Sequence, residues 1–135
     1  MLGSLICLAL IMASSVSIIG FAQQQDISEI SIEGIWEGKL KVPGTELRIV
    51  FKISKDSDGA LTTTMDSPDQ GVTGIPVDEV IFKDNTLRLE VKSIGGVYEG
   101  KVSEGFLVIE GEWKQSGGTF PLTVKRVDKA VEILR

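Results

Sequence analysis

Residues 86–92, Thr-Leu-Arg-Leu-Glu-Val-Lys, alternate between apolar and charged side chains after the first position. A period of two places all the apolar side chains on one face of an extended chain. The apolar face consists of Leu87, Leu89 and Val91, and the charged face consists of Arg88, Glu90 and Lys92. The stretch therefore predicts a strand of an antiparallel sheet that is buried on one side only.

The same alternation recurs on both sides of this strand, and short segments rich in Gly, Pro, Asp and Ser separate the runs. Turn-forming segments between alternating runs are typical of hairpins. Eight strands are predicted in this way, over residues 34–42, 46–54, 60–65, 75–83, 86–92, 97–103, 106–114 and 119–126. In the run 106–114, we expect Leu107, Ile109 and Trp113 to point inward.

Strands that are each apolar on one face need a common interior. Closing the sheet on itself buries that face and removes the exposed sheet edges. A strand every ten to twelve residues or so also fits a meander with short hairpins. We therefore predict an all-β fold, a small antiparallel up-and-down barrel of about eight strands, with a two-sheet β-sandwich as the alternative.

Three aromatic residues lie two positions from a glycine on the same face of a predicted strand. The pairs are Trp36 with Gly38, Tyr98 with Gly100 and Trp113 with Gly111. A glycine leaves room for a bulky ring or for tight strand coiling. We interpret Trp36, Tyr98 and Trp113 as structural residues of the core, and an aromatic clamp for a ligand is the alternative.

The Gly34-Ile35-Trp36 motif on the first strand resembles the Gly-x-Trp motif of lipocalins, which are calycin barrels. The resemblance implies that Arg126, on the last strand, packs structurally against Trp36. It also implies a small apolar ligand as a possible cargo. The many large apolar side chains on the short strands instead favour an interior filled with protein.

Residues 1–22 carry no charged side chain and end in Gly20 and Ala22, the small residues that signal peptidase requires. We predict a signal peptide over residues 1–22, a lead-in over 23–33, the barrel over 34–126 and a tail or start of a linker over 127–135. The chain is then extracytoplasmic, either periplasmic or secreted. The alternative is an uncleaved anchor, because about 20 apolar residues span a bilayer.

Composition excludes several classes of function. The chain has a net charge of −5, contains no histidine, and has a single cysteine, Cys7, within the predicted signal. A mature chain without His or Cys lacks a Ser-His-Asp triad, a thiol nucleophile and a His/Cys zinc site. The acidic balance argues against binding nucleic acid. We expect no enzymatic activity and no cofactor.

The loop over residues 66–74 is the most distinctive polar segment. Its candidate recognition residues are Asp66, Ser67, Asp69 and Gln70. The alternative is that Asp66 and Asp69 accept hydrogen bonds from backbone amides and so shape the turn. Residues 56–59, Asp-Ser-Asp-Gly, begin like a calcium loop but lack its remaining ligands, and a hairpin turn is favoured.

An ordered series of landmarks runs through the predicted barrel. It comprises residues 34–40 (Gly-Ile-Trp-Glu-Gly-Lys-Leu), 47–53, 65–71 (Met-Asp-Ser-Pro-Asp-Gln-Gly), 74–77, 98–100, 109–115 and 121–126. This series resembles an N-terminal β domain of secreted bacterial α/β-hydrolases of the serine esterase or peptidase type. In that family a linker and a catalytic domain follow. No nucleophile elbow, acid or histidine of such a hydrolase has a counterpart here.

These observations predict an exported, non-catalytic accessory or interaction module of bacterial origin. The resemblance implies a hydrolase domain or another exported protein as its partner, with membrane contact only through an uncleaved N-terminal segment. Two alternatives stay open: a lipocalin-like protein that binds a small apolar ligand, and the truncated product of a hydrolase gene.

Overall fold

A computed structural model describes residues 31–127, and these residues form β-structure with two single-turn 3₁₀ helices. The strands are β1 (Gly34–Val42), β2 (Thr45–Lys55), β3 (Leu61–Ser67), β4 (Val72–Pro76), β5 (Glu79–Lys83), β6 (Thr86–Val91), β7 (Gly96–Val102), β8 (Val108–Gln115) and β9 (Gly118–Val127). The helix η2 (Pro68–Gln70) connects β3 to β4, and η3 (Lys92–Ile94) connects β6 to β7. The predicted all-β fold is confirmed, whereas the predicted signal peptide and residues 128–135 lie outside the described residues.

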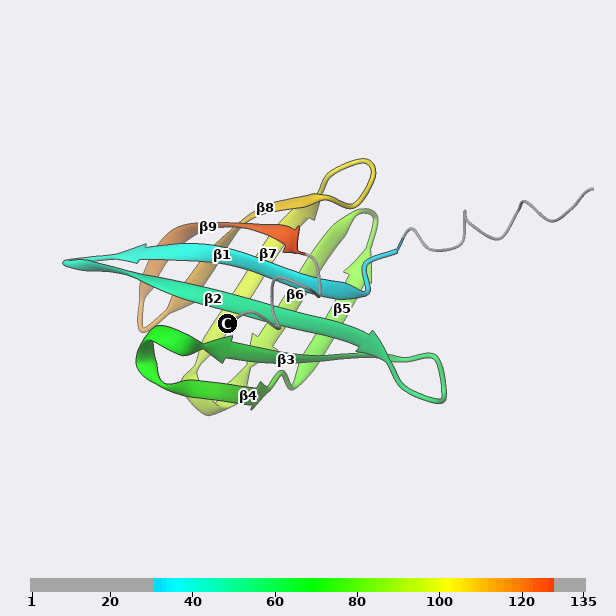
Figure 1. The fold of residues 1–135 in the computed structure, drawn as a ribbon, viewed down its shortest axis with the longest axis horizontal. Coiled ribbons are helices and arrows are strands. Elements are labelled where there is room, and N and C mark those ends of the chain that lie inside the picture. Colours follow the sequence, from blue (N-terminus) through cyan, green and yellow to red (C-terminus); the bar gives the residue numbers. More distant parts are fainter. Residues whose placement is uncertain (1–30, 128–135) are drawn as a thin grey trace, which may run out of the picture.

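All nine strands belong to one antiparallel sheet with the order β4-β3-β2-β1-β9-β8-β7-β6-β5. Strands that follow each other in the chain pair with each other, except β4 and β5, and β1 also pairs with β9. The sheet curls so that β4 and β5, its two ends, approach each other (Figure 1). A single curled sheet is barrel-like, and the two-sheet sandwich is excluded for the described part of the chain.

The prediction of one strand over residues 75–83 was wrong. That stretch is divided between β4, which pairs with β3, and β5, which pairs with β6. The chain bends at Val77 and Asp78, and the backbone N–H groups of these two residues donate hydrogen bonds to different strands. The amide of Val77 donates to the carbonyl of Thr63 at 3.1 Å, and the amide of Asp78 donates to the carbonyl of Glu90 at 2.8 Å. The sheet therefore has nine strands instead of eight.

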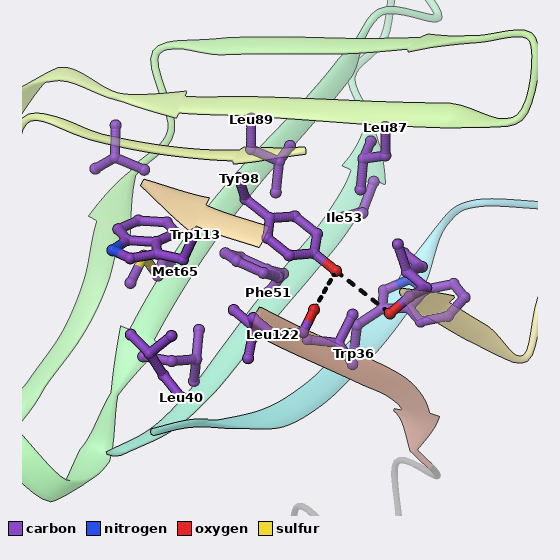
Figure 2. Close-up of a cluster of buried hydrophobic side chains, with 14 of the residues drawn as sticks. Trp36, Leu40, Phe51, Ile53, Met65, Leu87, Leu89, Tyr98, Trp113 and Leu122 are labelled. Carbon is purple, nitrogen blue, oxygen red and sulfur yellow. Dashed lines mark hydrogen bonds between the residues drawn. The ribbon is translucent and has the colours of Figure 1, made fainter. Parts of the chain in front are cut away.

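The interior of the curled sheet is filled with large side chains. The rings of Trp36, Phe51, Tyr98 and Trp113 are at most 1% exposed. Figure 2 shows Tyr98 and Phe51 between Trp113 on one side and Trp36 on the other. The Phe51 and Tyr98 ring centroids lie 5.2 Å apart. This packing fills the space between these strands with side chains.

Glycines let the strands approach each other beneath these rings. Gly100 and Gly111 face each other across β7 and β8. A Cβ atom on Gly111 would collide with the backbone of Glu99, and a Cβ on Gly96 would collide with the ring of Trp113. Only Gly fits where the backbone or an aromatic ring comes this close.

Leu107 was predicted to point inward and is instead 60% exposed. The cause is the backbone of Phe106, whose φ of 56° lies in the left-handed region. This conformation breaks the period of two just before β8 begins, so Phe106 packs against the core in place of Leu107. Ile109 and Trp113 are buried as expected.

Tyr98 is the only tyrosine of the chain, and its hydroxyl donates within the core to the carbonyls of Leu122 at 2.9 Å and Ile109 at 3.3 Å. Burial raises the pKa of Tyr98 well above its ordinary value of 10.0, and the charge of Glu110 adds to this rise. The neutral hydroxyl is therefore the form that the folded chain stabilises.

We predict that tyrosinate absorbance of the folded chain develops only well above pH 10.0, the ordinary value, and returns to that value in denaturant. Because the pKa is higher in the folded state, this group lowers the free energy of unfolding as the pH rises past its unfolded value. Tyr98→Phe should remove that part of the alkaline slope. An ordinary tyrosine titration in the folded chain would contradict the burial of the hydroxyl.

Candidate functional site

The two ends of the curled sheet differ, and Arg126 closes one of them. Its guanidinium carbon lies 4.5 Å from the centroid of the Trp36 ring. The guanidinium donates to the carbonyls of Glu33 at 2.6 Å and Phe106 at 2.9 Å, and also to the carbonyl of Ser31. Burial lowers the pKa of Arg126 from its ordinary value. One cation therefore ties the segment before β1 and the segment before β8 to the last strand.

Apolar side chains complete this closed end. Ile32 is 3% exposed, and its carbonyl accepts a hydrogen bond from the indole of Trp36 at 3.0 Å. Phe82 and Phe106 meet edge to face, with ring centroids 6.0 Å apart. These side chains cover the core at this end, which lies on the right in Figure 1.

The opposite end holds an apolar pocket of about 250 Å³. Ten apolar and three uncharged polar residues line it, and no charged residue does. The apolar residues are Leu40, Val42, Leu47, Ile49, Met65, Val72, Ile75, Ile94, Trp113 and Phe120. The β1–β2 and β8–β9 hairpins and η2 gather at this end, on the left in Figure 1. We call this pocket the open-end pocket.

The bend at Val77 and Asp78 explains why this end is open. Before the bend, β4 pairs with β3 and has no ladder to β6, and both β4 and η3 contribute residues to the pocket. Val72 of β4 is 39% exposed and Ile94 of η3 is 36% exposed. Two of the four exposed large apolar side chains among residues 31–127 thus lie at this rim.

The three polar residues of the pocket are held by hydrogen bonds. Ser67 is 2% exposed, and its hydroxyl donates to Oε1 of Gln70 at 2.6 Å. Oε1 of Gln115 accepts from the indole of Trp113 at 2.9 Å, and Nε2 of Gln115 donates to the carbonyl of Ile94 at 2.9 Å. Gln115 thereby fixes the Trp113 ring and η3 relative to each other.

The structure places the four candidate recognition residues on two sides of β3 and η2. Ser67 and Gln70 line the open-end pocket, whereas Asp66 and Asp69 face the outer surface. A carboxylate oxygen of Asp66 accepts from the amide of Gly74 at 2.7 Å, and one of Asp69 accepts from the amide of Arg48 at 2.8 Å. Both aspartates therefore hold the turn in place.

The loop predicted over residues 66–74 is shorter in the structure. Asp66 and Ser67 belong to β3, Val72 begins β4, and only residues 68–71 form the connection. Gly71 ends η2 with a φ of 70°, a left-handed backbone conformation that residues with a side chain rarely adopt. A shift of the β3–β4 register between Met65 and Ser67 accommodates this tight turn.

A second hollow of about 220 Å³ lies on the outer face of β1 and β2. Val50 is 6% exposed there although it points away from the core, because Arg48, Asp66, Pro68 and Val127 surround it. Arg48 lies 3.7 Å from Glu37, so this hollow is lined by charges that already have partners. Sequence reasoning missed the burial of Val50, since its cover comes from distant segments.

Potential metal ligands do not cluster in the described part of the chain. Residues 31–127 hold no group of three or more His, Cys, Asp or Glu side chains placed to bind a metal ion. The carboxylate of Asp56 accepts from the amides of Asp58 at 2.8 Å and Ala60 at 3.0 Å, so it forms the expected hairpin turn. Within the same range, no helix is long and apolar enough to cross a bilayer.

Comparisons with known proteins return no family model that matches the chain, and no curated protein or solved structure that is significantly similar to it.

Asp66 allows a direct test of the turn that borders the pocket. We predict that Asp66→Ala lowers the free energy of unfolding by about 1–2 kcal/mol, because the amide of Gly74 loses its acceptor. Asp66→Asn should cost less, since it keeps an acceptor oxygen and loses only the ion pair with Lys52, at 3.3 Å. Denaturant unfolding measures both, and Asp58→Ala, in an exposed turn, is the control. Equal stability of all three variants would contradict this role of Asp66.

Proposed function

We propose that the chain is an exported, non-catalytic binding module that takes a small apolar ligand in the open-end pocket. The observation that carries the proposal is the difference between the two ends of the sheet. One end is closed by Arg126 and Ile32, while the other exposes an uncharged apolar hollow of about 250 Å³. Concave apolar sites with a few convergent polar groups are the usual form of small-molecule sites.

The size of the pocket limits the ligand. An apolar cavity of roughly 150 Å³ is large enough for benzene, and pockets of roughly 300–1,000 Å³ hold drug-sized ligands. The open-end pocket, at about 250 Å³, falls between these limits. We therefore propose a ligand larger than a single aromatic ring and smaller than a typical drug.

The pocket lies at one end of the curled sheet and is not a cavity in its middle. Trp113 lines the pocket and packs into the core, so its ring separates the two regions. Because the core beyond it is filled, a ligand has no path deeper into the sheet. This arrangement reconciles the filled interior, expected from the strands, with ligand binding at the rim.

The uncharged dye N-phenyl-1-naphthylamine tests the proposal, because its fluorescence rises when an apolar site encloses it. We expect saturable binding to the purified full chain. Val72→Asp and Ile94→Asp should weaken binding about tenfold, because a charge at the rim must lose water when the pocket fills. Ile81→Asp and Leu107→Asp are matched controls, since both side chains are exposed apolar residues that do not line the pocket.

Two results would count against the proposal. One is the absence of saturable dye binding to the unmodified chain. The other is equal weakening by the rim variants and by the two control variants, which would show that the dye senses general surface hydrophobicity. Circular dichroism of each variant checks that the β-structure is retained.

A second candidate function follows from the resemblance to the N-terminal domains of secreted hydrolases. In it, the module is an accessory that docks on a hydrolase domain or another exported protein. The position of η2 supports it, because Asp69 anchors this turn to the backbone of Arg48 on the outer surface, and loops on rigid scaffolds often carry recognition. Gln70→Ala and Val72→Ala should then weaken partner binding while Ile81→Ala does not.

A further inference from the structure

We infer that the open-end pocket selects ligands by charge, and that it takes a neutral amphiphile in preference to the carboxylate or the ammonium compound of the same chain length. This inference rests on the proposed function and adds the chemical class of the ligand to it. It follows from the polar groups of the pocket and from the placement of the charges of the chain.

Charge is excluded from the pocket although charges are common elsewhere. Lys, Arg, Asp and Glu make up 24% of the chain, yet none of the thirteen lining residues is charged. An ionised ligand head would lose water on entry without gaining an opposite charge, and this loss is costly for a group that stays unpaired. A neutral hydroxyl, ester or amide loses much less.

The two carboxylates that neighbour Ser67 and Gln70 in the sequence do not supply a counter-charge. Asp69 follows Pro68 in η2, but its carboxylate is directed to the backbone amide of Arg48 on the outer surface. Asp66 is directed to the amide of Gly74 and to Lys52. Neither carboxylate therefore points into the pocket, and the polar groups on this side of it are those of Ser67 and Gln70.

Uncharged polar groups are nevertheless present where a ligand head would lie. Gln70 is exposed at the rim, and its Oε1 accepts from the buried hydroxyl of Ser67. An amide side chain offers both a donor and an acceptor, which suits a neutral head that also carries either. Val72 and Ile94, both at the rim, are suited to the apolar chain of such a ligand.

The test compares 1-octanol, methyl octanoate, octanoate and octylammonium at pH 7 by calorimetric titration of the full chain. The four compounds share a chain of eight carbon atoms, which in octanoate and its methyl ester includes the carboxyl carbon, and they differ in the charge of the head. We expect the two neutral compounds to bind at least about tenfold more tightly than either ion, a difference that corresponds to about 1.4 kcal/mol. Octanoate binding equal to or tighter than 1-octanol would overturn the inference.

A charge-switch variant separates a selective pocket from simple partitioning of neutral molecules. Val72→Lys places a cation at the rim and should tighten octanoate binding several-fold while weakening octylammonium. Ile81→Lys changes the net charge by the same amount on an exposed residue that does not line the pocket, and it should leave both affinities unchanged. Equal effects of the two variants would overturn the inference.

The outcomes distinguish this inference from the proposed function. If neutral and ionised compounds bind equally, ligand binding stands and charge selection fails. If none of the four compounds binds and the dye does not bind either, the proposed function fails together with the inference.

Discussion

The backbone amides of Val77 and Asp78 donate in different directions, one to β3 and the next to β6. These two hydrogen bonds connect the ends of a sheet whose terminal strands, β4 and β5, form no ladder with each other. A straight strand in this place could pair with β3 along one edge and with β6 along the other, which would close the sheet into a complete barrel. With the bend, the chain pairs with β3 before Val77 and with β6 after Asp78, and β4 forms no ladder with β6. The open-end pocket is a geometric consequence of that separation.

The closed end shows how the sheet avoids a second opening. Arg126, on the last strand, reaches the carbonyls of Glu33 and Phe106 and covers the ring of Trp36. Its hydrogen bonds satisfy backbone carbonyls that would otherwise be left at the end of the sheet. Because β1 and β9 are paired, the first and last strands bring Trp36 and Arg126 to adjacent positions. The closed end therefore carries a cation over an aromatic ring because β1 and β9 are neighbours in the sheet.

Much of the fold follows from local patterns in the sequence. Leu87, Leu89 and Val91 are fully buried, as the alternation of residues 86–92 predicted. The positions of most turns also follow from Gly, Asp and Pro. The pattern could not reveal the bend at Val77, because the change of partners from β3 to β6 depends on how distant strands are placed. Leu107 was misplaced for a related reason, since the left-handed backbone of Phe106 has no signature in the period of two.

The candidate site was less accessible from the sequence. The loop residues Ser67 and Gln70 were among the candidates, but the apolar lining of the pocket comes from six strands and from η3. Val42, Ile94 and Phe120 are ordinary apolar positions in a linear chain, and only the curl of the sheet brings them together. Asp66 and Asp69 were candidates because of their charge, yet their carboxylates accept hydrogen bonds from backbone amides.

A barrel with a packed interior can still have a pocket at one end, and Trp113 lies where the two regions meet. Its indole donates to Gln115, which in turn holds the carbonyl of Ile94, so the ring is fixed at the boundary between core and pocket. On one side the ring contributes to the packed interior, and on the other it forms part of a hollow open to solvent. Most of the apolar lining of the pocket also belongs to the core or packs against it, and among the apolar lining residues only Val72 and Ile94 do not. Under the proposed function, these two rim residues are the positions where the lining can change with the ligand while the core stays the same.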